Sequence, residues 1–411
     1  MSLRRLSFAI QHTRKLHRSL YFSAAEMARA MTVTFLGTCS GGGPNESRNC
    51  SSLVLDCKLA NGALWMVDCA EGTTRQFAFQ PPDTPSWLKP NSVTKMFITH
   101  MHADHCMGII PMLRNILYPP SIDPNAFVPI NPHPKIEIFG PAGIRTFVRS
   151  IMTMTLTHTA DKYVVHELLR PDDVPTPCDP PEVMHTNEVA GKDIWCSEDG
   201  FWREFTIGRS VFGDVLVDAG PILHRDPCLG FIFREHEEPK RKIVILGDTY
   251  DPSPIIPLCM SPSLLIHEAT DAHIPREIAP QHRRTPEKVL HTALARGHSI
   301  PQMAGEFAKT IGAEKLVLNH IGSRHVCSFP APRHDRDSRL LVIREIERQA
   351  TEAWGSGRHA MAAWDFMRVV VPAPESESMR QNDQNRSSSY EHVYADVGAD
   401  GLPYVNKKRK W

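Results

Sequence analysis

The order of strand and helix patterns along the chain predicts an α/β sandwich, with sheets inside and helices outside. Short apolar or alternating runs, typical of strands, recur throughout residues 31–318, and segments with helical spacing lie among them. Hydrophobic residues make up 41% of the chain and charged residues 22%, which is ordinary for a globular protein with a sizeable core. No apolar run reaches about 18 residues, so we do not expect a transmembrane helix.

The strand patterns begin at Met31, where residues 31–37 alternate before the turn Gly41-Gly42-Gly43-Pro44. A short apolar strand at 96–99 runs directly into a segment rich in histidine. Further strands are predicted at 52–56, 64–68, 136–139, 215–217, 231–233, 243–246 and 315–318. Helical spacing predicts helices at 108–117, 143–154, 286–295 and 302–311.

The first thirty residues differ from the rest of the chain. Residues 1–30 carry six basic side chains against one acid, interleaved with apolar residues, which resembles a mitochondrial targeting leader. The alternatives are a disordered basic leader, or an extension bypassed by an internal start at Met27 or Met31. A shorter form of that kind is expected in the nucleus or cytosol, with the basic run at 407–410 as a candidate nuclear signal.

Two other segments also depart from the strand and helix pattern. Residues 166–210 are rich in proline and acids, which predicts an inserted surface segment. Residues 373–411 are polar and predicted to be disordered. The folded domain is therefore expected to span residues 31–372.

Charge and cysteine content narrow the class of protein. The formal net charge is zero, and between residues 31 and 372 there are 34 basic against 39 acidic side chains. This balance is not that of a protein that grips nucleic acid by bulk charge. The ten cysteines include no Cys-x-x-Cys pair, so a reducing compartment is favoured over a disulfide scaffold.

Four candidate metal ligands lie within six residues, at His100-Met101-His102-Ala103-Asp104-His105. A lone histidine is usually a surface or core residue, but three histidines and one aspartate at the end of a buried strand favour a metal site. Imidazole and carboxylate suit Zn²⁺. Four ligands cannot all serve one open catalytic zinc. The spacing therefore suggests two ions, with His100 and His102 on one and Asp104 and His105 on the other.

Each of these ions needs further ligands from distant parts of the chain. Three candidates follow or end a strand pattern: His224, Asp248 in Gly-Asp-Thr, and His320. Asp248 is a candidate bridge between the ions. Taken singly, each has an ordinary structural alternative, a core histidine or a turn aspartate.

These residues together resemble a known family. His-x-His-x-Asp-His, then a distant His, a Gly-Asp-Thr and a final strand-ending His is the order of the metallo-β-lactamase superfamily, whose fold is an αββα sandwich. Finer motifs resemble short-form ribonuclease Z (tRNase Z), the tRNA 3′-processing endonuclease, over roughly residues 31–372. The segments that carry this resemblance are Thr34-Phe-Leu-Gly-Thr38, Val67-Asp-Cys-Ala-Glu-Gly-Thr73, Ile266-His-Glu-Ala-Thr270, Gly297-His-Ser299 and Leu318-Asn-His320.

The resemblance implies two zinc ions per chain and agrees with the pairing suggested by the spacing. The ligands that it implies are His100, His102 and His224 for the first ion, Asp104, His105 and His320 for the second, and Asp248 for both.

The resemblance also implies roles in proton transfer. Asp104 is the family's proton acceptor, and His267, held by Glu268, is the candidate proton donor. His298 is an auxiliary candidate, for which a solvated helix start is an equally good interpretation. Asp68 is expected to support the ligand loop, and a structural role in a turn is its alternative.

The function expected from the resemblance is a zinc-dependent endoribonuclease that removes the 3′ trailer from tRNA precursors, acting as a homodimer. The alternative is a two-zinc phosphodiesterase for small or cyclic nucleotides. A metallo-β-lactamase scaffold without enzyme activity, which only binds RNA or protein partners, is disfavoured because all seven candidate ligands are present.

The largest departure from the family pattern is a missing segment. Ribonuclease Z normally carries a long basic arm between the third metal motif and Gly-Asp-Thr. Here only nine residues, 234–242, separate Phe233 from the strand predicted at 243–246. We therefore expect weak hold on tRNA, aided only by a small basic patch at Lys240-Arg241-Lys242.

Overall fold

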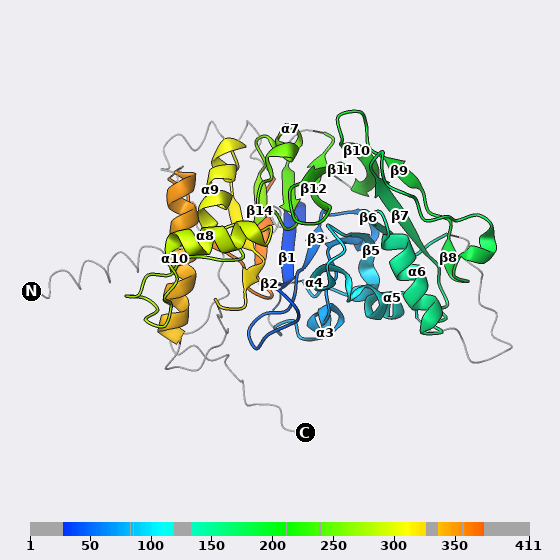
Figure 1. Cartoon of the computed structure of the whole chain (residues 1–411). Coiled ribbons are helices and arrows are strands. Elements are labelled where there is room, and N and C mark those ends of the chain that lie inside the picture. Colours follow the sequence, from blue (N-terminus) through cyan, green and yellow to red (C-terminus); the bar gives the residue numbers. More distant parts are fainter. Residues whose placement is uncertain are drawn as a thin grey trace, which may run out of the picture. The chain divides into compact units, whose positions relative to one another are not determined.

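Two mixed β-sheets face each other in the computed structural model (Figure 1). It describes residues 28–82, 84, 86–118, 133–210, 212–237, 240–325, 336–355 and 357–373. The first sheet has the strand order β18-β1-β3-β4-β5-β6-β7-β8, with β9 also beside β7. The second has the order β10-β11-β12-β13-β14-β15-β17, and β2 pairs with β16 separately.

The strands of the first sheet are β1 (Met31–Gly37), β3 (Ser52–Asp56), β4 (Leu64–Val67), β5 (Val93–Phe97), β6 (Ile136–Pro141), β7 (Tyr163–Leu169), β8 (Glu188–Val189), β9 (Asp193–Trp195) and β18 (Arg368–Val371). Those of the second are β10 (Trp202–Ser210), β11 (Gly213–Ile222), β12 (Cys228–Glu235), β13 (Lys242–Leu246), β14 (Leu264–Glu268), β15 (Leu316–Asn319) and β17 (Met361–Ala362). The separate pair is β2 (Cys39–Ser40) and β16 (Ile321–Gly322). The helices are α3 (Thr73–Ala78), α4 (Ala103–Cys106), α5 (Ile109–Leu117), α6 (Ile144–Met154), α7 (Ile256–Cys259), α8 (Pro286–Ala295), α9 (Pro301–Thr310) and α10 (Arg336–Trp354).

Alternation of side chains along the strands produces four layers. In β5, Phe97 points into the core between the sheets, whereas Met96 packs with α5 and α6 on the outer face. The same alternation in β14 sends Ile266 between the sheets and Leu265 towards α9 and α10. Helices therefore cover both outer faces, with α8 to α10 on one side and α3 to α6 on the other (Figure 1). This is the predicted sandwich.

Local signals explain why several helices begin where the sequence predicts. In α8, Pro286 occupies the first turn and the Thr285 hydroxyl accepts a hydrogen bond from the backbone of Lys288. The prediction 286–295 is confirmed, and α6 and α9 agree with their predictions to within one residue. Among the described residues, no helix combines the length and the apolar character that crossing a membrane requires.

The prediction that all of 166–210 is an inserted surface segment is wrong at both ends. β7 is buried along its whole length and pairs in parallel with β6. β10 pairs with β11 in the second sheet. Only the part between them, with the short strands β8 and β9, lies at the edge of the first sheet. Proline and acidic residues are concentrated in this middle part, and for that reason the predicted segment extended over the strands on either side.

The short connection between β12 and β13 is a hairpin, because the two strands pair directly, with Arg234 opposite Lys242. The basic patch predicted on this hairpin is smaller than expected, because Arg241 does not contribute to it. Arg241 is 3% exposed, and its guanidinium contacts both carboxylate oxygens of Glu235. The Lys242 ammonium donates to the backbone oxygen of Met260. Arg241 is therefore paired inside the fold, whereas Lys240 is exposed and Lys242 is half-buried.

One compact unit spans Ala30–Val371, and each of its ends lies one residue from the predicted domain limits of 31 and 372. Residues 1–27 of the predicted leader, and residues 374–411 of the predicted tail, lie outside the described residues.

Candidate metal centre

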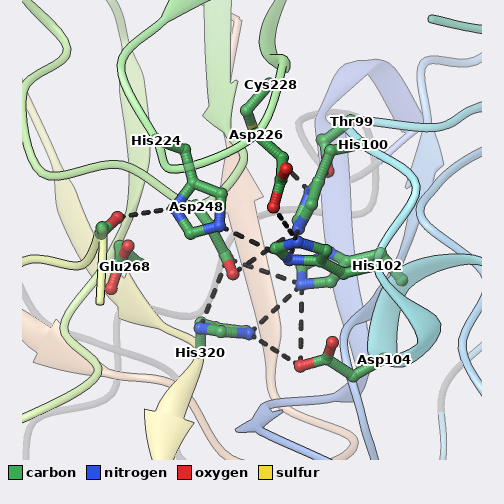
Figure 2. Close-up of polar contacts among 12 residues, drawn as sticks. Thr99, His100, His102, Asp104, His224, Asp226, Cys228, Asp248, Glu268 and His320 are labelled. Carbon is green, nitrogen blue, oxygen red and sulfur yellow. Dashed lines mark hydrogen bonds and ion pairs between the residues drawn. The ribbon is translucent and has the colours of Figure 1, made fainter. Parts of the chain in front are cut away.

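The predicted metal ligands meet at one edge of the two sheets, where strands end. His100 follows β5, and Asp104 and His105 lie in α4. The loop between β11 and β12 carries His224, while Asp248 follows β13 and His320 follows β15 (Figure 2). β13, β14 and β15 run parallel, so their carboxyl ends lie at the same edge of the second sheet.

The first group of converging side chains is His100, His102, His224 and Asp248, whose candidate ligand atoms all lie within 4.8 Å of one another. His102 Nδ1 is 2.9 Å from His100 Nε2 and 3.4 Å from His224 Nε2. Asp248 Oδ2 lies 3.7 Å from His100 Nε2. Three ring nitrogens and one carboxylate oxygen thus face a common point.

The second group is Asp104, His105 and His320, again with ligand atoms within 4.8 Å. His320 Nε2 is 3.2 Å from His105 Nε2 and 3.3 Å from Asp104 Oδ2. The other carboxylate oxygen of Asp248, Oδ1, lies 3.5 Å from His105 Nε2. Asp248 therefore stands between the two groups, with one oxygen towards each.

The arrangement fits a metal ion better than a network of hydrogen bonds. Each of the five histidines uses its outward nitrogen for a polar contact, so in the neutral form of the rings the inward nitrogens carry lone pairs that repel one another unless a cation lies between them. The outward partners are Thr99 Oγ1 for His100 at 3.0 Å, Asp226 Oδ2 for His102 at 2.7 Å, Asp68 Oδ2 for His105 at 2.7 Å, the Gly297 oxygen for His224 at 2.6 Å and Thr270 Oγ1 for His320 at 2.9 Å. Burial and the neighbouring His105 hold the pKa of His100 well below its usual value, so its ring is neutral, the form that binds a metal.

Asp68 supports the ligand loop. Its side chain is buried, and besides holding His105 it accepts a hydrogen bond from the backbone nitrogen of Thr99 at 2.8 Å. The Thr99 hydroxyl contacts the same carboxylate at 3.0 Å. Asp68 also adopts a positive φ of 56°, so it both turns the chain and orients a candidate ligand. Asp104, in turn, accepts from the backbone nitrogen of Gly41 at 2.8 Å.

The structure corrects the prediction for the proton donor. Side chains alternate along β14, so His267 points away from the metal groups towards α9, where its ring lies 5.8 Å from that of Phe307. It is fully buried, and its Nδ1 contacts only the backbone oxygen of Glu268. The Glu268 carboxylate instead lies 3.0 Å from Nδ1 of His298.

His298 occupies the position that we had assigned to His267. Its ring is 5.1 Å from that of His224 and 5.6 Å from that of His320, and its Nδ1 is 3.7 Å from Asp248. Burial alone would lower the pKa of His298, but the carboxylates of Glu268 and Asp248 outweigh it and raise this pKa above its usual value. His298 is therefore suited to carry a proton beside the metal groups.

Two other contacts were not predicted, although one of them involves Thr270, which ends the segment Ile266–Thr270 noted in the sequence. Thr270 links Glu268 to His320, since its hydroxyl donates to the Glu268 carboxylate and accepts from His320 Nδ1. Asp226 lies only two residues from His224, yet it contacts the ring of His102 rather than joining a metal group itself.

This chain is similar to several known proteins. No family model matches the chain. The chain is 30% identical to zinc phosphodiesterase ELAC protein 1 of Bos taurus and of Homo sapiens, with 84% of this chain and 99% of each relative covered. It is 28% identical to ribonuclease Z of Streptococcus sanguinis over 77% of this chain and 99% of that protein.

Solved structures of proteins of the same kind are also similar to this chain. Human short-form tRNase Z matches with a TM-score of 0.55 and 31% identity, over 83% of this chain and 99% of that one. A long-form RNase Z from yeast matches with a TM-score of 0.53 at 18% identity, over 90% of this chain and 45% of that one, which supports the fold alone. Fold and site define a metal-dependent hydrolase of the metallo-β-lactamase superfamily. The chain belongs to the ribonuclease Z family.

Proposed function

We propose that this chain is a zinc-dependent endoribonuclease that hydrolyses a phosphodiester to remove the 3′ trailer from tRNA precursors. The observation that carries the proposal is the pair of converging ligand groups with Asp248 between them and the Glu268–His298 pair alongside. The relatives named ribonuclease Z and zinc phosphodiesterase support the same activity.

We propose two zinc ions per chain, one in each group. The first would be held by His100, His102 and His224, the second by Asp104, His105 and His320, with Asp248 shared. Asp248 supports this number because its two oxygens face different groups. If Asp248 bound only one ion, the other group would still offer three protein ligands, which is the number found in open catalytic zinc sites.

Zinc bound there would supply the positive charge that activates a water and stabilises charge on the phosphate. The protein side chains have separate tasks around it. Asp104, whose carboxylate is fixed by Gly41 and His320, is placed to accept the proton of the water. His298, held by Glu268, is placed to donate a proton to the departing oxygen.

The docking of tRNA is where this chain departs from its family. The hairpin between β12 and β13 leaves no room for a long basic arm, and Arg241 is buried on Glu235. We therefore propose that the chain retains its hydrolytic activity but binds tRNA with low affinity. This same observation favours a second function, a phosphodiesterase for small or cyclic nucleotides that uses the site without docking tRNA.

One experiment separates the two functions. The zinc-loaded full chain is incubated with a tRNA precursor that has a 3′ trailer, and the cut is mapped to the nucleotide. A single cut at the end of the tRNA supports the first function. Turnover of cyclic nucleotides with no defined cut in the precursor would favour the second. Hydrolysis of bis(p-nitrophenyl) phosphate would not distinguish them.

Assembly and location are further proposals. We propose a homodimer, on the basis of the family alone, and sedimentation at twice the 46.2 kDa of one chain would support it.

We propose that residues 1–30 direct the chain to mitochondria, because this segment is basic, nearly free of acid and interleaved with apolar residues. A start at Met27 or Met31 would instead leave the protein in the nucleus or cytosol.

A further inference from the structure

The loop between β11 and β12, residues 223–227, contacts the metal centre through two side chains. His224 belongs to the first ligand group, and Asp226, two residues later, contacts His102 of the same group (Figure 2). The loop is anchored at its start, where Leu223 exchanges backbone hydrogen bonds with Asp251 and Tyr250 at 3.0 and 2.9 Å. These hydrogen bonds hold the start of the loop that carries both His224 and Asp226.

His102 is more exposed than its neighbours in the ligand groups. Its side chain is 21% exposed, against 0% for His100 and 1% for His105. The partner of its outward nitrogen is also exposed. Asp226 is 57% exposed, whereas Asp68 and Thr99, which hold the other two rings, are buried. Core packing thus contributes less to the orientation of His102, and the contact with Asp226 matters more.

The geometry of this contact selects one form of the imidazole. Asp226 Oδ2 lies 2.7 Å from His102 Nε2, and a carboxylate can only accept, so Nε2 carries the proton. A neutral ring then has its lone pair on Nδ1, the atom that faces His100 and His224. Without the carboxylate, water could serve Nε2 in either tautomer, and the ring could present Nδ1–H or, turned over, a carbon atom to the group in place of the lone pair.

We propose that Asp226 is a positioning residue, whose carboxylate fixes the tautomer and orientation of His102 so that Nδ1 is presented to the first metal ion. The inference rests on the two-ion centre proposed above and adds a residue outside its ligand set. Carboxylates that hold a ligating histidine raise metal affinity by about 10- to 100-fold. The effect should be confined to one ion, because Asp226 contacts no member of the second group.

The test measures zinc affinity directly rather than activity. Full-length wild type, Asp226→Ala and Asp226→Asn are stripped of metal and titrated with zinc against a chromophoric chelator. Asp199→Ala is the matched control, since Asp199 is also an exposed carboxylate, 50% exposed, but pairs with Arg203 away from the centre. We expect Asp226→Ala to bind one zinc equivalent about 10- to 100-fold more weakly and the other unchanged. Asp226→Asn, whose amide oxygen still accepts from Nε2–H, should lose less, and the control nothing.

A melting curve of each metal-free protein separates positioning from a structural role. Asp226→Ala should melt at the same temperature as wild type when neither holds zinc. Two zinc equivalents bound by Asp226→Ala with wild-type affinity would overturn the inference and leave the metal centre standing. Equal weakening of both equivalents, together with a lower metal-free melting temperature, would also overturn it, as a structural effect. A wild type that binds no zinc would overturn the metal centre itself.

Discussion

The variant Glu268→Gln keeps the shape of a buried side chain and removes its negative charge. Glu268 Oε1 lies 3.0 Å from His298 Nδ1, and the side chain is 1% exposed. A hydrogen bond to a charged group contributes about 1.5–3 kcal/mol. Because this charge helps to raise the pKa of His298, we expect that pKa to fall in the variant.

The sign of the effect on turnover follows from the role proposed for His298. A proton donor works only when protonated, so turnover is lost as pH rises through its pKa. In wild type this pKa is raised above its usual value by Glu268 and Asp248, against the opposing effect of burial. In Glu268→Gln the alkaline limb of the pH–rate profile should therefore move to lower pH. At a pH above both limbs, turnover on RNA should fall by about 10- to 100-fold, which is the factor that about 1.5–3 kcal/mol corresponds to.

The assay compares two substrates across pH, with zinc content measured for each protein. On a tRNA precursor the departing oxygen needs a proton, whereas p-nitrophenolate leaves bis(p-nitrophenyl) phosphate without one. The loss should therefore appear on RNA and nearly vanish on the small substrate. His267→Asn is the control, because His267 lies outside the centre, and it should keep both activities. An alkaline limb that does not move, or an equal loss on both substrates with zinc retained, would refute the role of the Glu268–His298 pair.

Three other predictions follow from the structure and the sequence. Asp248→Ala should lose most metal from both groups, since its oxygens face one group each; full zinc by elemental analysis would contradict the bridging role. Filter binding of a tRNA precursor across a salt series should show poor affinity with a log–log slope of about −3 or shallower, because Arg241 is paired inside the fold; tight binding with a steep slope would mean that another part of the chain docks tRNA. A chain starting at Met31 should lose mitochondrial import and keep its activity, and unchanged import would remove the leader proposal.

Much of the fold could be predicted from the sequence because its signals are local. The alternation at 31–37 and the proline and threonine at the start of α8 act within a few residues, and the structure has β1 and α8 at the predicted positions. The candidate ligand set could also be predicted from the sequence, since four of its members lie within residues 100–105 and the others lie at or just after the ends of strands. Which ions these side chains hold stays a prediction, but their convergence at one edge of the sheets is a property of the structure.

Tertiary structure alone decided which neighbours each side chain meets. His267 and Glu268 are adjacent in sequence, and only their place in β14 sends the first towards α9 and the second to His298, thirty residues away. The buried partner of Arg241 and the contact between His102 and Asp226 likewise depend on how distant segments pack. A sequence pattern records the faces of an element, but not which element lies opposite each face. For this reason the residue type and spacing predicted the two ligand groups, whereas the contacts of His298 with Glu268 and of His102 with Asp226 became visible only in three dimensions.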